Sequence, residues 1–322
     1  MNAALMASGL AVALLIDRLL GEPPARLHPV VGMGRYLGWI GGLITARQHP
    51  QREPAPDWRA FGAGALAWCA GAALVGGLAW LAQQAMAGLP LVAGGLLLGC
   101  LLKPLLAWRM LRDEVAAVEA ALQQSLAAGR ERLSWLVSRD TTQLNESAVR
   151  ESAIESLAEN LNDSVVAPIF WFVLLGLPGA AVYRFANTAD AMWGYRGVYR
   201  GRNWEWAGKW AARADDALSW LPARLTALLL KGLSRGLPLQ ALRREAARTP
   251  SPNSGWPMAA MALKLGVCLR KPGVYALNAA GRAPQAADTA QALIYASKAV
   301  YVQVLWSFLA IVLIAMEGSW LR

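Results

Sequence analysis

Long uncharged stretches alternate with short charged segments along the chain. The longest covers 43 residues between Arg59 and Lys103, and a turn sequence at 88–90 divides it into a predicted hairpin of two membrane helices. A stretch of 18 uncharged residues at 299–316 is long enough to span a bilayer at about 1.5 Å per residue. Residues 1–16 are also uncharged, and because they lack a basic start and a cleavage site they predict a retained first helix.

Two other apolar segments are interrupted. Residues 164–183 are uncharged but contain Gly176-Leu177-Pro178-Gly179, a sequence that breaks helices. Irregular backbone at membrane depth must be surrounded by protein or by a wet cavity, so we expect a kinked or re-entrant helix there. Residues 217–233 are interrupted by Pro222 and Arg224 and indicate an interfacial or re-entrant segment.

These patterns predict an all-α polytopic integral membrane protein. We expect about four membrane-spanning helices, re-entrant or interfacial helices and a cytoplasmic amphipathic helical region, within a single domain over residues 1–322. The segment 17–59 carries six arginines and the segment 231–298 carries ten lysines and arginines, which places both on the cytoplasmic side. The predicted cytoplasmic polar segments are about 17–59, 112–163, 184–216 and 231–298.

Composition agrees with a membrane protein. Hydrophobic residues make up 56% of the chain and charged residues 16%, against about 25% charged in soluble domains. The net charge of +10 alone suggests nucleic acid or an anionic membrane surface, and the apolar content favours membrane lipid over nucleic acid. The three cysteines are far apart and only two histidines occur, which weighs against disulfide, zinc and histidine-based sites.

The segment 112–163 is acidic in this otherwise basic chain and ends in a stripe of carboxylates. Glu151, Glu155, Glu159 and Asp163 are spaced four residues apart on a predicted helix, where like charges destabilise one another unless a cation compensates. One interpretation is a solvated helix face relieved by Arg150. The other is a Mg²⁺ site, since this ion takes one or two carboxylates together with water and phosphate oxygens.

Three more polar clusters follow. They are Asn187-Thr188-Ala189-Asp190 with Arg196, Arg213-Ala214-Asp215-Asp216 leading to Arg224, and Ser251-Pro252-Asn253. The aspartate pair indicates either a helix N-terminus, where the macrodipole favours acids, or a paired or metal-bound site. Arginine forks bind phosphate and carboxylate, so carboxylates beside arginines favour phosphate-bearing substrates. No P-loop or dinucleotide fingerprint is present.

Taken in order, these motifs resemble the adenosylcobinamide-phosphate synthase family, CbiB or CobD, of cobalamin biosynthesis. The residues that carry the resemblance are Asp17, Gly21-Glu22-Pro23, His28-Pro29-Val30, Arg139-Asp140-Thr141, Glu155, Glu159-Asn160, Asp163, Ala167-Pro168, Asn187-Thr188, Asp190, Met192, Gly194-Tyr195, Ala212-Arg213, Asp215-Asp216, Pro222-Ala223-Arg224 and Ser251-Pro252-Asn253. The chain departs from the family pattern in a few places, among them Arg270-Lys271-Pro272 where Gly-Gly-Pro is usual.

The resemblance implies a bacterial inner-membrane enzyme with its active site on the cytoplasmic side. Such an enzyme joins adenosylcobyric acid to (R)-1-amino-2-propanol O-phosphate, or a related amino alcohol, in a step that needs ATP and Mg²⁺. Its implied partners are the corrinoid substrate, the amino-alcohol phosphate and membrane lipid. Association into a homo-oligomer or with other late cobalamin-pathway membrane enzymes is left open.

On this hypothesis the candidate residues have three roles. Metal binding is assigned to Glu155, Glu159, Asp163, Asp190 and Asp215. Substrate and phosphate binding is assigned to Arg139, Arg150, Asn160, Asn187, Arg196, Arg213, Arg224 and Asn253. Removal of the ammonium proton needs a base, because the pKa of an amine is near 10, and Asp140, Asp216 and His28 are the alternatives. The competing functions are a non-catalytic membrane sensor or regulator related to AmpE, and a transporter.

Overall fold

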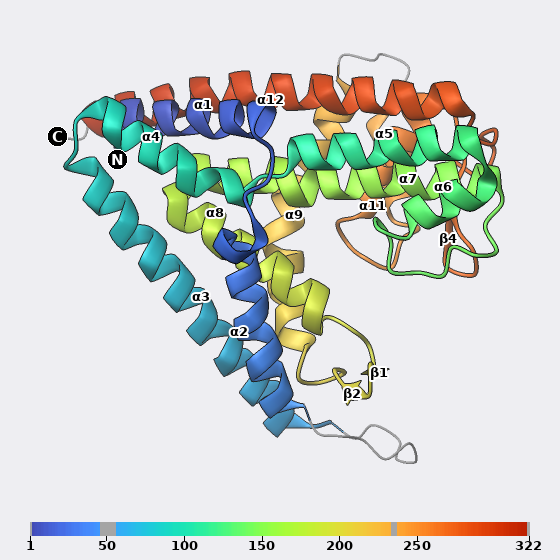
Figure 1. The fold of residues 1–322 in the computed structure, drawn as a ribbon, viewed down its shortest axis with the longest axis horizontal. Helices are drawn as coiled ribbons and strands as arrows, with labels where there is room; N and C mark the ends of the chain where they lie inside the picture. The colour runs from blue at the N-terminus through green and yellow to red at the C-terminus, as the bar shows by residue number, and fades with distance from the viewer. Residues whose placement is uncertain (1, 46–55, 233–236, 321–322) are drawn as a thin grey trace. The chain divides into compact units, whose positions relative to one another are not determined.

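The computed structural model describes residues 2–45, 56–232 and 237–320, so parts of two predicted polar segments lie outside it. The described chain is almost entirely helical, apart from two short antiparallel hairpins, which confirms the predicted fold class (Figure 1). It divides into two compact units, and helices α8, α9 and α12 each contribute to both.

The first unit comprises residues 1–106, 168–218 and 310–322. Its elements are α1 (Ala3–Leu19), η1 (Ala25–Leu27), α2 (Pro29–Ile44), α3 (Trp58–Ala87), α4 (Leu91–Leu102), η2 (Lys103–Leu105), most of α8 (Ala167–Trp193), β1 (Val198–Tyr199), β2 (Arg202–Asn203), the start of α9 (Lys209–Lys231) and the end of α12 (Ala286–Trp320). Strands β1 and β2 pair in register Val198 to Asn203.

Small residues let α1 and α4 pack closely in the first unit. The two helices lie side by side (Figure 1). A Cβ atom added at Gly99 of α4 would collide with Val12 of α1, and one added at Gly95 would collide with Ser8. Membrane helices commonly use small residues at such contacts, because lipid tails offer no hydrophobic drive for association.

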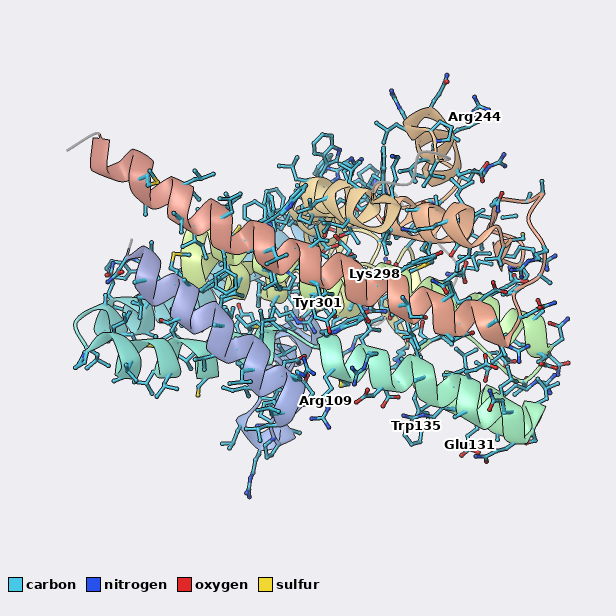
Figure 2. The ribbon with its side chains drawn as sticks, turned by 90° about the horizontal axis from the view of Figure 1, so that it is seen from above. Arg109, Glu131, Trp135, Arg244, Lys298 and Tyr301 are labelled. Carbon is cyan, nitrogen blue, oxygen red and sulfur yellow. The ribbon has the colours of Figure 1, made fainter. Side chains whose placement is uncertain are left out.

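The second unit comprises residues 107–167 and 219–309. Its elements are α5 (Trp108–Gln124), α6 (Leu126–Leu133), α7 (Glu146–Leu161), the π-helical turn η3 (Asn162–Val166), the end of α9, α10 (Leu239–Ala246), α11 (Gly255–Leu265), β3 (Leu269–Lys271), β4 (Tyr275–Leu277) and most of α12. Helix α7 is its buried centre, and Trp135 and Tyr301 are large side chains exposed at its surface (Figure 2).

Four helical stretches of the described chain are long and apolar enough to cross a membrane. They are Trp58–Ala87, Leu91–Gln124, Glu146–Trp193 and Ala286–Met316. The predicted hairpin is confirmed by α3 and α4, which are joined at Gly88-Leu89-Pro90, and the predicted helix at 299–316 lies within α12. The predicted first helix forms as α1, but with 17 residues it is shorter than these four.

The predicted interruption at 176–179 is confirmed as a break in helix α8. Gly176 has φ of 70° and ψ of −158°, a conformation that only glycine adopts readily. The break frees the backbone N–H of Leu177, which donates to Gln83 Oε1 of α3 at 2.7 Å. A side chain from a neighbouring helix therefore satisfies the irregular backbone, as the interior of a membrane protein requires.

Candidate functional site

Helix α7 buries the first two carboxylates of the predicted stripe. Asn145 caps the helix by accepting from Ala148 N at 2.9 Å, and residues 149–158 are almost all buried. Glu151 is 2% exposed and Glu155 is 4% exposed. The interpretation of the stripe as a solvated helix face is therefore wrong for these two residues, because a buried carboxylate must be paired.

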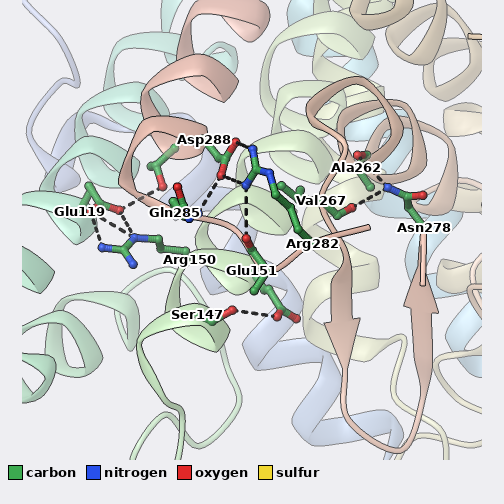
Figure 3. A network of polar contacts seen from close by, with 12 residues as sticks. Glu119, Ser147, Arg150, Glu151, Ala262, Val267, Asn278, Arg282, Gln285 and Asp288 are labelled. Atoms are coloured by element: carbon green, nitrogen blue, oxygen red, sulfur yellow. Dashed lines mark hydrogen bonds and ion pairs between the residues drawn. The ribbon is translucent and has the colours of Figure 1, made fainter. Parts of the chain in front are cut away.

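Arginines from two other segments supply the compensating charge. Arg139, in the loop before α7, donates from Nη2 to Glu155 Oε2 at 3.0 Å and also to Ser152 Oγ. Arg270 of β3 donates from Nη2 to Glu151 Oε1 at 2.8 Å, and its Nε and backbone N donate to Oε2. Figure 3 shows Glu151 with the hydroxyl of Ser147, which also donates to it.

A pocket of about 650 Å³ lies between α7, the loop before it and the β3–β4 hairpin. Its polar lining includes Arg139, Arg270, Lys271 and Ser152, and Leu144, Val274 and Pro272 are among its apolar residues. Arg139 pairs with Glu155 and Arg270 pairs with Glu151, and Lys271 also lines the pocket, so these five side chains carry one excess positive charge. Such a lining suits an organic anion with an apolar part.

Tyr275 of β4 also lines this pocket, and its hydroxyl donates to the sulfur of Met258 at 3.8 Å. Burial raises the pKa of its hydroxyl above the ordinary value of 10, and the nearby charges of Glu155 and Glu159 raise it further. The phenol is therefore protonated over the whole physiological pH range.

The second half of the stripe ends in the π-helical turn. Asn162 Nδ2 donates to Asp163 Oδ1 at 2.8 Å, and the buried hydroxyl of Thr226 donates to Asn162 Oδ1 at 3.0 Å. Asn160 donates to the carbonyl of Ser156 in its own helix. Single π-turns within α-helices often occur at functional sites, and this one displaces Asp163 from the regular i, i+4 spacing.

Arg150 contacts carboxylates on both sides. Its Nε and Nη2 donate to Glu119 of α5 (Figure 3). Its Nη1 lies 2.6 Å from Glu146 Oε1. Glu119 also accepts from the hydroxyl of Thr289 in α12. Because the Arg150 guanidinium already holds two carboxylates, the structure favours a role in joining helices over the predicted role in binding phosphate.

Two motifs far apart in sequence meet at Arg224. Its Nη1 donates to Asn253 Oδ1 at 2.8 Å and its Nη2 to the carbonyl of Pro252. The guanidinium lies 4.3 Å from the ring centroid of Trp220 and 4.9 Å from that of Trp256. Arg224 thus fixes the loop before α11, and burial lowers its pKa below the ordinary value while leaving it charged.

The remaining acidic candidates lie in the first unit. Asp215 and Asp216 are in the second turn of α9 rather than at its N-terminus, so the macrodipole explanation is wrong. Burial raises the pKa of Asp216 and the charge of Arg196 opposes this, which brings two of the predicted clusters together. Asn187 Oδ1 accepts from Arg184 at 3.4 Å. Arg213 is exposed, and Asp190 is half-buried near the end of α8.

His28 belongs to a charged cluster in the same unit. Its Nε2 lies 3.3 Å from Glu22 Oε2, and Glu22 Oε1 is 2.6 Å from the ammonium nitrogen of Lys103. Lys103 also contacts Asp17 Oδ1 at 3.0 Å and the carbonyl of Leu106 at 3.1 Å. Lys103 is 2% exposed and Asp17 is 3% exposed.

The donor set limits how a metal ion could be held. Within residues 2–45, 56–232 and 237–320, no three His, Cys, Asp or Glu side chains form a group suited to a metal ion. Glu155, the first residue of the predicted set, is paired with Arg139. Half-exposed Glu159 and Asp163 fit the mode in which Mg²⁺ takes one or two carboxylates alongside water and phosphate oxygens, but not a closed protein cage.

The sequence pattern gave little indication that several residues of these clusters belong to a charged site. Lys103 was only the boundary of an apolar stretch, and Arg270 and Lys271 stood out only as departures from a family pattern. Tyr275 had no signal. Their position depends on the pairing of β3 with β4 and on contacts to helices more than 80 residues away.

The fold and pocket together define a helical membrane protein with an arginine-rich site backed by buried carboxylates. The chain belongs to the CobD/Cbib protein family, which it matches over residues 10–301. It is 40% identical over 310 residues to the probable cobalamin biosynthesis protein CobD of Pyrococcus furiosus, covering 96% of this chain and 99% of the relative. It is 44% identical over 273 residues to the cobalamin biosynthesis protein CobD of Chromobacterium violaceum, covering 84% and 82%. No solved structure matches it.

Proposed function

We propose that the chain is an adenosylcobinamide-phosphate synthase. It joins adenosylcobyric acid to (R)-1-amino-2-propanol O-phosphate, or a related amino alcohol, in an amide bond at the expense of ATP. The main support is the near full-length relationship to cobalamin biosynthesis proteins, and the arginine-rich pocket supplies a site for anionic substrates.

In this proposal Arg139, Arg270 and Lys271 bind the anionic groups of the substrates. Buried Glu155 and Glu151 orient the two guanidinium groups. A guanidinium held on one side by a carboxylate loses little further side-chain entropy when it binds a phosphate. Because Arg270 and Lys271 replace the glycines usual in the family, they are candidates for the choice of amino alcohol.

The reaction requires an activated carboxyl group. A carboxylate oxygen of the corrinoid takes the γ-phosphoryl group of ATP, which gives an acyl phosphate and ADP. The amine nitrogen then attacks the acyl carbon, the carbon–oxygen bond to phosphate breaks, and inorganic phosphate leaves as the amide forms. One ammonium proton passes to a base before the attack, and a second nitrogen proton is taken up by the departing phosphate as the amide forms. Arginines stabilise charge that develops on the transferring oxygens.

Three residues remain candidates for the base. Asp140 is exposed, and the backbone N–H of Thr142 lowers its pKa, which weakens it as a base. Burial raises the pKa of Asp216 and strengthens it. His28 is hydrogen-bonded to Glu22, which can orient its ring. On basicity the proposal favours Asp216 over Asp140.

Mg²⁺, when bound, would neutralise the phosphate charge of ATP. Glu159 and Asp163 are the residues proposed to hold it. Replacing Glu159 by Gln tests this assignment, with Glu131→Gln, an exposed position on α6, as the matched control. The assay is ATP-dependent formation of the corrinoid amide by purified protein in nanodiscs, followed by mass spectrometry. We expect loss of most activity in the first variant only, and undiminished activity in E159Q would contradict the metal assignment.

Complementation separates an enzyme from the regulator and transporter alternatives. A strain that lacks the synthase should make cobalamin from cobyric acid when it carries this chain, and the empty strain should do so only with added cobinamide. If cells carrying the chain still require cobinamide, the proposed activity is wrong.

A further inference from the structure

An apolar cavity of about 440 Å³ lies within the first unit, apart from the charged pocket. It lies between α2, α3, α8 and residues around η2 and is open on one side. Met33, Val75, Leu177 and Phe185 are among the residues that line it. Tyr36 is its one polar side chain, and the Tyr36 hydroxyl already donates to the carbonyl of Ala67 at 2.8 Å.

Water is a poor occupant of this space. A buried water molecule needs two to four polar partners, and apolar cavities stay dry. The walls are mostly helical, so most of their backbone groups are bonded within the helices. The freed N–H of Leu177 is bonded to Gln83, and the single hydroxyl is taken. An apolar occupant restores the dispersion contacts that the lining would otherwise lack.

The surroundings of α3 identify the source of that occupant. Helix α3 is one of the four membrane-length helices, and only 11% of its most apolar 18-residue window is buried. Leu74 and Leu78, which line the cavity, are 55% and 60% exposed. The cavity wall is therefore continuous with a face of α3 that the membrane hydrocarbon covers.

We propose that the cavity binds an acyl chain of a membrane phospholipid. A methylene group occupies about the same volume as a liquid water molecule, about 30 Å³, so the cavity holds about 15 methylenes, or one acyl chain. The occupant is a phospholipid and not a plain hydrocarbon, because the cavity has a polar end. Pro29 and Leu105 line it, His28 directly precedes Pro29, and Lys103 stands two residues before Leu105.

Beyond Pro29 and Leu105 along the chain lies the charged cluster of Asp17, Glu22, His28 and Lys103. Helix α2 contacts η2 at this end. The other described wall residues offer hydrocarbon contacts only.

Filling the cavity from two different helices tests the proposal. A Cβ at Gly32 of α2 meets no atom within 4 Å, so Gly32→Leu places its side chain in the cavity without a backbone clash. Ala79→Leu fills it from α3. Gly77→Leu is the matched control, because Gly77 is helical and equally open but does not line the cavity.

The measurement is native mass spectrometry of the full chain, taken from nanodiscs of phosphatidylethanolamine and phosphatidylglycerol and washed in detergent. Wild type and G77L should retain one phospholipid per chain. In G32L and A79L we expect retention to fall at least about tenfold, the effect of about two lost methylene contacts. A wild-type chain without bound phospholipid overturns the proposal. The proposal is also overturned if G32L or A79L binds as much phospholipid per chain as the wild type does, provided that the variant unfolds in a cooperative thermal transition and is therefore folded.

Discussion

Each unit of the protein buries a charge cluster, and the two clusters differ in whether the cation is buried with its carboxylate. In the first unit a cation and a carboxylate are both inside: Lys103 and Asp17 have side chains 2% and 4% exposed, and Glu22 is 20% exposed. In the second unit the carboxylates are inside. Glu151 and Glu155 have side chains 2% and 6% exposed, and they are paired with arginines that are 53% and 22% exposed.

The difference indicates different tasks. The donors of Lys103 are directed to three oxygens of the protein, so the first cluster is closed and holds the end of α1 against η2. Arg139 and Arg270 are anchored by one side and line a pocket, so the second cluster can bind a further anion. Removing a partner from a buried ion pair is costly, whereas an exposed cation contributes little to stability.

The largest effect is expected from Lys103→Met. The substitution leaves the buried carboxylate of Asp17 and the carboxylate of Glu22 without their cation, and such a loss costs about 3–5 kcal/mol. Thermal unfolding of the detergent-solubilised protein should show a much lower transition temperature. Adding Asp17→Asn and Glu22→Gln should recover part of the loss. A single variant as stable as wild type would show that the first cluster is not a closed structural unit.

The next largest effect is expected from Gly176→Ala, which compares backbone strain in the two units. Gly176 in α8 and Gly266 after α11 both have positive φ, 70° and 67°. A Cβ at Gly176 would collide with the Gln83 side chain, and one at Gly266 would meet nothing within 4 Å. Strain of this kind costs about 1–3 kcal/mol. The unfolding temperature should therefore fall further in G176A than in G266A. Equal shifts would contradict the contact with Gln83.

Arg270→Lys tests the availability of the second cluster. The variant keeps a positive charge for Glu151 but loses the planar fork that suits phosphate. We expect little change in stability and about a tenfold rise in the KM for a phosphate-bearing substrate, the effect of about one charge-assisted hydrogen bond. Arg248→Lys is the control, since Arg248 is similarly exposed and pairs with Glu245 away from the pocket. If R270K and R248K have equal KM values, the phosphate of the substrate does not bind at Arg270.

The smallest effect concerns Asp216 and the pH dependence of stability. Burial raises its pKa above the ordinary value of 3.8, so the folded protein binds its proton more tightly than the unfolded chain does. Stability from this group is therefore present at low pH and decreases as the pH rises through the folded pKa. At neutral pH Asp216→Asn should raise the unfolding temperature slightly, and the gain should vanish in acid. If Asp216 is also the base, the same variant loses amide formation while it gains stability.

The sequence predicted well whatever depends on local pattern. The charge-free stretch around the turn at 88–90 specified the α3–α4 hairpin, because length and hydropathy alone define such helices. The i, i+4 spacing placed Glu151 and Glu155 on one helix and required a cation nearby. The glycine and proline at 176–179 predicted the break in α8, because neither residue continues a helix easily.

The rest depended on contacts that no local pattern encodes. The cations that pair with Glu151 and Asp17 come from residues 119 and 86 positions away in the chain. Arg150 was predicted to relieve its own helix, yet it pairs with Glu119 of α5 as well as with Glu146. The π-turn at Asn162–Val166 also changes the spacing on which the predicted metal set relied.

The bond between Gln83 and the broken helix α8 also constrains the order of membrane insertion. Gln83 belongs to α3, and its partner N–H at Leu177 lies 94 residues later in the chain. Helix α3 is therefore synthesised well before the group that its glutamine binds. The bond that satisfies the break in α8 therefore joins an early helix of the chain to a late one, and α8 finds its partner already synthesised.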